Sequence, residues 1–138
     1  MAIKAKFLGR EAVMKKLNAM LPEAERELAE AQMDVAREAA SRIAARAPVG
    51  ATGDYKSSIE ADRIGNRPHQ ELTGIRETKD KNATAVFAKF TWRWLEFGTV
   101  NMKKGARPHI FPTWRAYRKT ARRKMAAAVN KAVRKAKS

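Results

Sequence analysis

The strongest structural signal in the chain is a helix-forming stretch, residues 22–46, which reads PEAERELAEAQMDVAREAASRIAAR. Its apolar side chains recur every three or four residues, as one face of a helix requires; they are Leu28, Ala31, Val35, Ala39 and Ile43. Glutamates gather in the first turn and arginines in the last, where the helix dipole favours them, and Pro48 ends the run. Pro22 suits the first position of a helix because its missing N–H is not needed there. We therefore predict a helix over 22–46, preceded by a separate short amphipathic helix over 9–21.

The hydrophobic period changes in the middle of the chain. Residues 57–64 can alternate as a strand, and residues 69–78 with 83–90 predict a hairpin. Glycine and proline mark a loop over 98–108, and a final helix of about 112–136 follows. The order predicts an α+β fold, with N-terminal helices and a C-terminal helix packed on a small antiparallel β-sheet.

Length and composition limit the class of protein. At 138 residues the chain predicts a single domain, 1–138, large enough to bury a core. It has no run of 18 apolar residues and no signal-peptide pattern at its start, so we expect no membrane partner. The absence of cysteine excludes disulfides and thiolate metal sites, and it fits synthesis in a reducing cytoplasm.

Charge is distributed unevenly along the chain. All 14 acidic residues lie in 1–97, whereas 98–138 holds 13 Lys and Arg and no acid. A field of one sign attracts polyanions, which makes nucleic acid a candidate partner; a solvated basic tail is the alternative. Six basic residues lie within about three turns of the final helix, away from its apolar stripe, as candidate contacts for DNA or an acidic partner: Arg115, Arg118, Lys119, Arg122, Arg123 and Lys124.

Patterns for catalysis and cofactor binding are missing. His69 and His109 stand forty residues apart with no carboxylate or thiol at ligand spacing, so we expect no metal site. No glycine-rich phosphate loop is present, and we expect neither a cofactor nor an enzyme. Glu96 lies among large apolar residues, WRWLEF, and must be paired or change its pKa. It could act as a general acid or base, but no second catalytic group is near it, which favours a structural ion pair.

Motifs that read DNA sequence are also missing. The chain has no zinc-finger spacing and no heptad zipper, and its prolines leave no room for a helix–turn–helix. The basic final helix could still contact phosphates without reading sequence. A non-specific nucleic-acid-binding protein therefore remains an alternative function.

Three short segments occur in a fixed order along the chain. They are 47–59, APVGATGDYKSSI; 94–99, WLEFGT; and 106–112, ARPHIFP. They resemble the "AP…TG.L..SI", "…EFGT" and "ARPF..PA" elements of a family of phage tail components named after gene product ten of phage Hong Kong 97. The sequence departs from this pattern at Asp54 and Tyr55, where a leucine is usual, and at His109, where phenylalanine is usual.

The resemblance implies a structural protein of the head–tail junction of a long-tailed bacteriophage. Such proteins form a ring, here of about six copies, at the neck or top of the tail. The ring acts in tail completion or as a tail terminator, and the genome passes through its lumen. The implied partners are further copies of the chain, neighbouring neck and tail proteins, and DNA in transit without sequence preference. The implied location is the virion.

The motif segments contain residues that shape the backbone. Gly53 and Gly98 allow tight bends that a side chain would obstruct, and Pro48 and Pro108 fix the chain direction at element ends. Thr99 completes the second segment. We expect these residues to have structural roles.

The second motif segment also contains bulky side chains beside an acid. Trp92, Trp94 and Phe97 form either part of the core, the simpler interpretation, or a subunit interface. Arg107 is the expected partner of Glu96, across the loop or between subunits. The basic helix could line the lumen or dock on an acidic neighbouring ring, and the sequence leaves both open.

Overall fold

The computed structural model describes residues 2–49, 53–70, 79–99 and 105–137. In chain order the elements are α1 (Ala2–Arg46), α2 (Asp54–Ser58), β1 (Glu60–Arg63), the 3-10 turn η1 (Ile64–Asn66), β2 (Thr84–Phe87), α3 (Trp92–Phe97) and α4 (Phe111–Lys137). The predicted α+β class is confirmed. Across the described ranges, no helix has an apolar stretch that could cross a membrane.

The first helix is longer than the sequence predicted. α1 is one helix of 45 residues with Pro22 inside it, so the predicted break between 9–21 and 22–46 is wrong. An internal proline removes one backbone hydrogen bond and costs about 3 kcal/mol, but its fixed φ is itself helical. Pro22 is exposed, so its ring displaces no packed neighbour and the helix continues through it. The predicted end is correct, since α1 stops at Arg46, two residues before Pro48.

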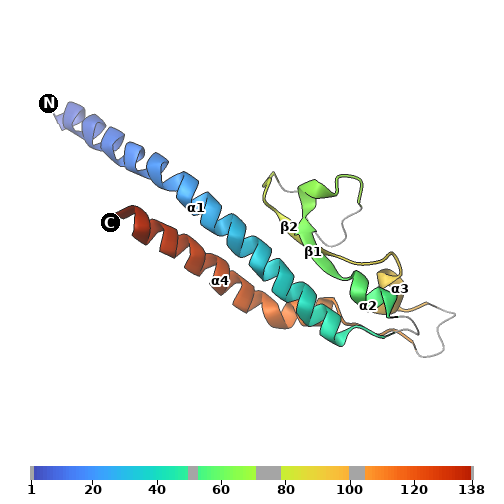
Figure 1. Ribbon diagram of the computed structural model, residues 1–138. Coiled ribbons are helices and arrows are strands. Elements are labelled where there is room, and N and C mark those ends of the chain that lie inside the picture. The colour runs from blue at the N-terminus through green and yellow to red at the C-terminus, as the bar shows by residue number, and fades with distance from the viewer. Residues whose placement is uncertain (1, 50–52, 71–78, 100–104, 138) are drawn as a thin grey trace.

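The two long helices pack against each other. Figure 1 shows α4 running antiparallel to α1, with the first turns of α1 extending past the C-terminal end of α4. Val35 and Ala39 of α1 form a buried cluster with Tyr117 and Ala121 of α4. Alanine at these positions lets the two helix backbones approach closely.

A small sheet covers another face of α1. β1 and β2 pair antiparallel, with Glu60 opposite Phe87 and Arg63 opposite Thr84. The buried cluster beneath them joins α1 to the segment that leads into β1, through Ala40, Ile43, Ala47, Tyr55 and Ile59. α1 therefore lies between the sheet and α4 (Figure 1). The C-terminal helix was predicted to pack on the sheet, but it packs mainly on α1.

The predicted strands are shorter than expected. Ser57 and Ser58 belong to α2, where their hydroxyls donate to backbone carbonyls of the same turn, so only Glu60–Arg63 is strand. β2 occupies Thr84–Phe87 and its partner is β1. The predicted partner strand, 69–78, falls from residue 71 onward outside the described residues. In β2 the side chains alternate as in a half-buried strand, because Ala85 and Phe87 are buried while Thr84 and Val86 are less so.

Candidate functional site

Glu96 holds the start of α4. The side chain is buried, with only 3% of it exposed. Its Oε2 accepts the backbone N–H groups of His109 (2.8 Å) and Ile110 (2.9 Å), and its Oε1 accepts that of Phe111 (3.0 Å). Backbone N–H groups at a helix start have no partner inside the helix, and the helix dipole favours a negative charge there. Glu96 therefore caps α4 from a distant element, α3.

Within one chain, Glu96 and Arg107 do not form the expected ion pair. Arg107 is exposed, and its backbone N–H donates to the Leu95 carbonyl at 2.7 Å. The prediction of a buried, paired carboxylate was correct, but the partners are backbone groups. A contact of Arg107 with Glu96 of another subunit stays a prediction.

His109 and Tyr55 extend this buried cluster. His109 Nδ1 lies 2.8 Å from the Arg107 carbonyl, so it carries the proton in the neutral ring and Nε2 accepts from the Tyr55 hydroxyl. Burial, aided by the negative charge of Glu96, raises the pKa of Tyr55 to about 12, which keeps this hydroxyl protonated. In the sequence, His109 and Tyr55 stand out only as separate departures from the motif segments. The signal for their contact was that both positions exchange an apolar residue for one that can hydrogen-bond.

Burial decides what this cluster can do chemically. Tyr55, Glu96 and His109 are exposed by 8%, 3% and 1%, so a substrate has no access to them. They join α2, α3 and the start of α4 instead. Within the described ranges, no group of three or more acidic or histidine side chains could hold a metal ion.

Two glycines of the motif segments have a positive φ, which favours glycine. Gly53 precedes α2 with φ 69°, and Gly98 follows α3 with φ 80°. A Cβ at Gly98 would lie 3.2 Å from the Cβ of Ala106, so the second and third motif segments touch there. Pro48 lies just beyond α1, while Thr99 and Pro108 are exposed on either side of this contact.

An aromatic surface surrounds α3. We call Phe90, Trp94 and Phe97 the aromatic end; they are 69%, 51% and 62% exposed. Phe90 meets Trp94 edge to face, with 5.6 Å between ring centroids. Trp92 is half-buried against the core, as the simpler interpretation expected. That interpretation does not hold for Trp94 and Phe97 within one chain, which leaves the subunit interface as a proposal.

A second apolar surface lies on the projecting part of α1. Val13, Met14, Leu17 and Leu21 share one face of the helix and are each about half exposed or more. We call them the N-terminal stripe. Figure 1 shows that this part of α1 and the α3 region lie at opposite ends of the molecule.

The six predicted contact residues of α4 are all exposed. Lys124 differs from the others because it pairs with Glu38 of α1. Glu38 also accepts the Tyr117 hydroxyl (2.7 Å) and an Arg42 N–H (3.0 Å). Lys124 first, then Tyr117 and Arg42, lower the pKa of Glu38 to about 2.

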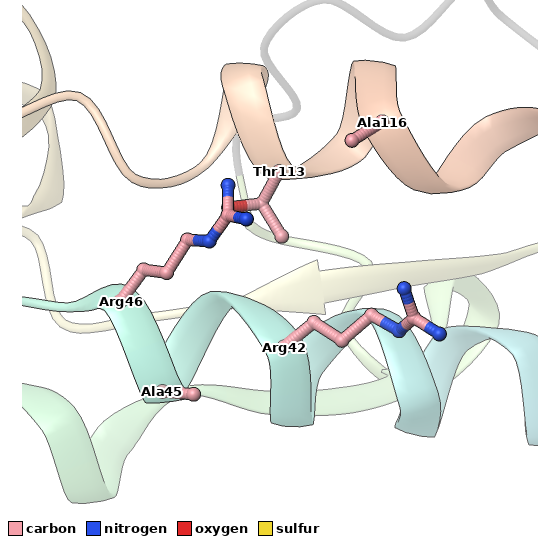
Figure 2. Close-up of a pocket in the computed structure, with 5 residues that line it drawn as sticks. All are labelled: Arg42, Ala45, Arg46, Thr113 and Ala116. Carbon is pink, nitrogen blue, oxygen red and sulfur yellow. The ribbon is translucent and has the colours of Figure 1, made fainter.

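A shallow pocket lies between the end of α1 and the start of α4. Figure 2 shows the residues that line it, Arg42, Ala45 and Arg46 from α1 and Thr113 and Ala116 from α4. Its volume is about 180 Å³. From the sequence, the arginines of this helix end are explained only by the helix dipole, because nothing in the local sequence shows which residues face α4.

Comparison with known proteins gives one family. The model described as "Bacteriophage HK97-gp10, putative tail-component" matches residues 11–98. The match runs from α1 through α3 and ends before α4. No curated protein and no solved structure matches the chain.

Proposed function

Because the chain belongs to the HK97-gp10 family of bacteriophage tail components, we propose that it is a structural protein of the head–tail junction. In this proposal several copies, about six, form a ring at the neck or top of a long tail. The ring completes or terminates the tail, contacts neighbouring neck and tail proteins, and lets DNA pass. A structural tail component needs no catalytic site, and we propose none.

The observation that carries the ring is the pair of unlike apolar surfaces at opposite ends of the subunit, the N-terminal stripe and the aromatic end. Scattered exposed apolar residues are ordinary, but grouped ones mark contact sites. Contact between two different surfaces is head-to-tail, and repeated head-to-tail contact closes into a ring when the rotation permits. This geometry suits a ring better than a two-fold dimer.

Interface variants in the phage test this proposal. Leu17→Gln with Leu21→Gln removes two of the four apolar side chains of the N-terminal stripe, while neither side chain is buried within its own subunit. Ala19→Gln is the control, because Ala19 is exposed on the opposite face of the same turns.

The double variant should yield heads and tails that fail to join, and the control should yield joined particles. Cross-linking of intact wild-type virions should produce a ladder of this protein. A single copy per particle, or normal junctions in the double variant, would contradict the ring.

The second candidate is a non-specific nucleic-acid-binding protein. The exposed basic residues of α4, in a stretch without any acid from 98 to 138, favour it. Oligomeric state separates the candidates. A monomer that coats DNA and dissociates with rising salt would support this second function, whereas a closed ring in the particle supports the first.

A further inference from the structure

The helix α4 forms the outermost layer of the subunit. α1 lies between the sheet and α4 (Figure 1), and α4 packs mainly on α1. The side of α4 that faces away from α1 is therefore open to solvent or to a partner along the described part of the chain.

Helix geometry separates the basic residues of α4 into two sides. Each residue turns the helix by about 100°, and the buried Tyr117 marks the side that faces α1. Lys124 and Lys135 lie within about 20° of Tyr117 around the helix. They pair with acids of α1, Glu38 and Glu27 respectively. The lysines on the inner side of α4 are thus neutralised by α1.

Three basic residues lie on the opposite side of α4. Arg115, Lys119 and Arg122 are each about 140–160° from Tyr117 around the helix, and they fall within an arc of about 60°. We call these three residues the outer ridge. It is about 10 Å long, and all three side chains are exposed. The outer ridge therefore presents three cations side by side, on the side of α4 that α1 does not cover.

The positive charge of this side is not neutralised within the subunit. Arg118 and Arg123 flank the outer ridge, at about 100° and 120° from Tyr117 in opposite directions. Both are exposed. Among the described residues, no carboxylate pairs with the ridge or with these two arginines. A field of one sign remains on this side, and it favours a polyanion.

The outer ridge lacks the centre of a protein–protein interface. Between Arg115 and Arg122, no apolar side chain lies on this side of the helix. Protein interfaces have an apolar core from which charged residues are depleted, whereas DNA interfaces are polar and strongly positive. Contacts of this kind neutralise backbone phosphates and need no base recognition. The composition of the ridge thus favours DNA over an acidic protein.

We infer that the outer ridge of α4, with its two flanking arginines, binds the phosphate backbone of double-stranded DNA without reading its sequence. Lys124 does not belong to this surface, because Glu38 holds it on the α1 side. The inference deepens the proposed function by naming the face of the subunit that meets DNA, and it rests on that function for its biological role.

A matched pair of triple variants tests the inference on the purified chain. The site variant is Arg115→Gln, Lys119→Gln, Arg122→Gln, and the control is Arg37→Gln, Lys56→Gln, Arg107→Gln. Each replaces two arginines and one lysine, and all six side chains are exposed. Glutamine suits a helix about as well as arginine and lysine do, so thermal melts of both variants should match the wild type.

The measurement is the affinity for a short labelled double-stranded DNA over a range of salt concentrations. The slope of log affinity against log salt should fall by about 0.9 for each phosphate contact that the site variant loses, and by clearly less in the control. Equal slopes in the two variants would overturn the inference, because net charge alone would then explain binding. A wild-type chain that does not bind DNA at low salt would overturn it as well.

Cross-linking locates the DNA independently of affinity. The chain has no cysteine, so a photoactivatable cross-linker can be attached at one introduced cysteine. Lys119→Cys should cross-link to bound DNA, and Lys56→Cys, on α2, should not. Equal yields from the two positions would contradict a DNA surface on the outer side of α4.

A polyanionic competitor identifies the chemistry of the partner. At equal charge concentration, poly-glutamate should bind more weakly than DNA and should discriminate less between the two triple variants. Poly-glutamate that binds as tightly and discriminates as strongly would assign the ridge to an acidic protein and overturn the DNA inference. Any of these failures leaves the ring proposal intact, since cross-linking of virions tests the ring separately.

Discussion

Replacing Glu96 with glutamine should weaken the junction between α3 and α4. The carboxylate accepts three backbone N–H groups, two at Oε2 and one at Oε1. Glutamine keeps one oxygen, so its NH2 group must face a backbone N–H that then has no acceptor. The site is buried, and water cannot replace the missing partner.

The magnitude follows from these hydrogen bonds. An unsatisfied buried donor costs about 1–3 kcal/mol, and loss of a negative charge at a helix start adds about 0.3–1 kcal/mol or more in a buried setting. Glu96→Gln should therefore lower the free energy of unfolding by about 1–4 kcal/mol. No catalytic rate should change, since none is proposed.

Urea denaturation followed by circular dichroism measures this cost. Glu60→Gln is the control, because Glu60 is an exposed partner of Arg67 and such pairs contribute about 0–1 kcal/mol. If Glu96→Gln unfolds at the same urea concentration as Glu60→Gln, the carboxylate does not hold the start of α4 and the reasoning is refuted.

Three further changes should have measurable effects. Tyr55→Phe should cost about 1–2 kcal/mol in urea denaturation, because it leaves the Nε2 of buried His109 without its donor; a loss under about 0.5 kcal/mol would show that the bond contributes little. The pKa of Glu38 is lowered from 4.5 to about 2, so the stability that its carboxylate contributes is complete above pH ~4.5 and is lost as the pH falls toward ~2. The melting temperature should therefore fall less steeply with acid in Glu38→Gln than in the wild type. Identical melting profiles against pH would contradict this. Gly98→Ala should cost about 1–2 kcal/mol, since φ is +80° and the new Cβ would press on a neighbouring chain segment; Gly65→Ala, where a Cβ meets nothing closer than 4.0 Å, should cost less, and the reverse order would refute the strain argument.

Local patterns predicted those features that depend on neighbouring residues. The end of α1 at Arg46 follows from apolar spacing, dipole charges and Pro48, and α4 follows from an apolar stripe flanked by basic residues. Pro22 shows the limit of this reasoning. The sequence gives the cost of a proline inside a helix, but it does not show whether the helix ends there or continues, as α1 does.

Glu96 shows a second limit. Its apolar neighbours predicted that the carboxylate would be buried and paired. Arg107 was the expected partner by charge, yet the backbone N–H groups of residues 109–111 donate to the carboxylate instead. Backbone partners have no residue-type signature, so no sequence pattern could have indicated them.

The sequence by itself determined the helices, the excess positive charge beyond residue 98, the glycine bends and the motif segments, because each depends on residue type or short spacing. Only the tertiary structure decided which surfaces face outward and which distant residues meet. The antiparallel packing of α1 on α4 brings Arg42 and Arg46 beside Thr113 and Ala116. Contacts between residues so far apart along the chain arise from the packing of whole helices, and local patterns do not encode them.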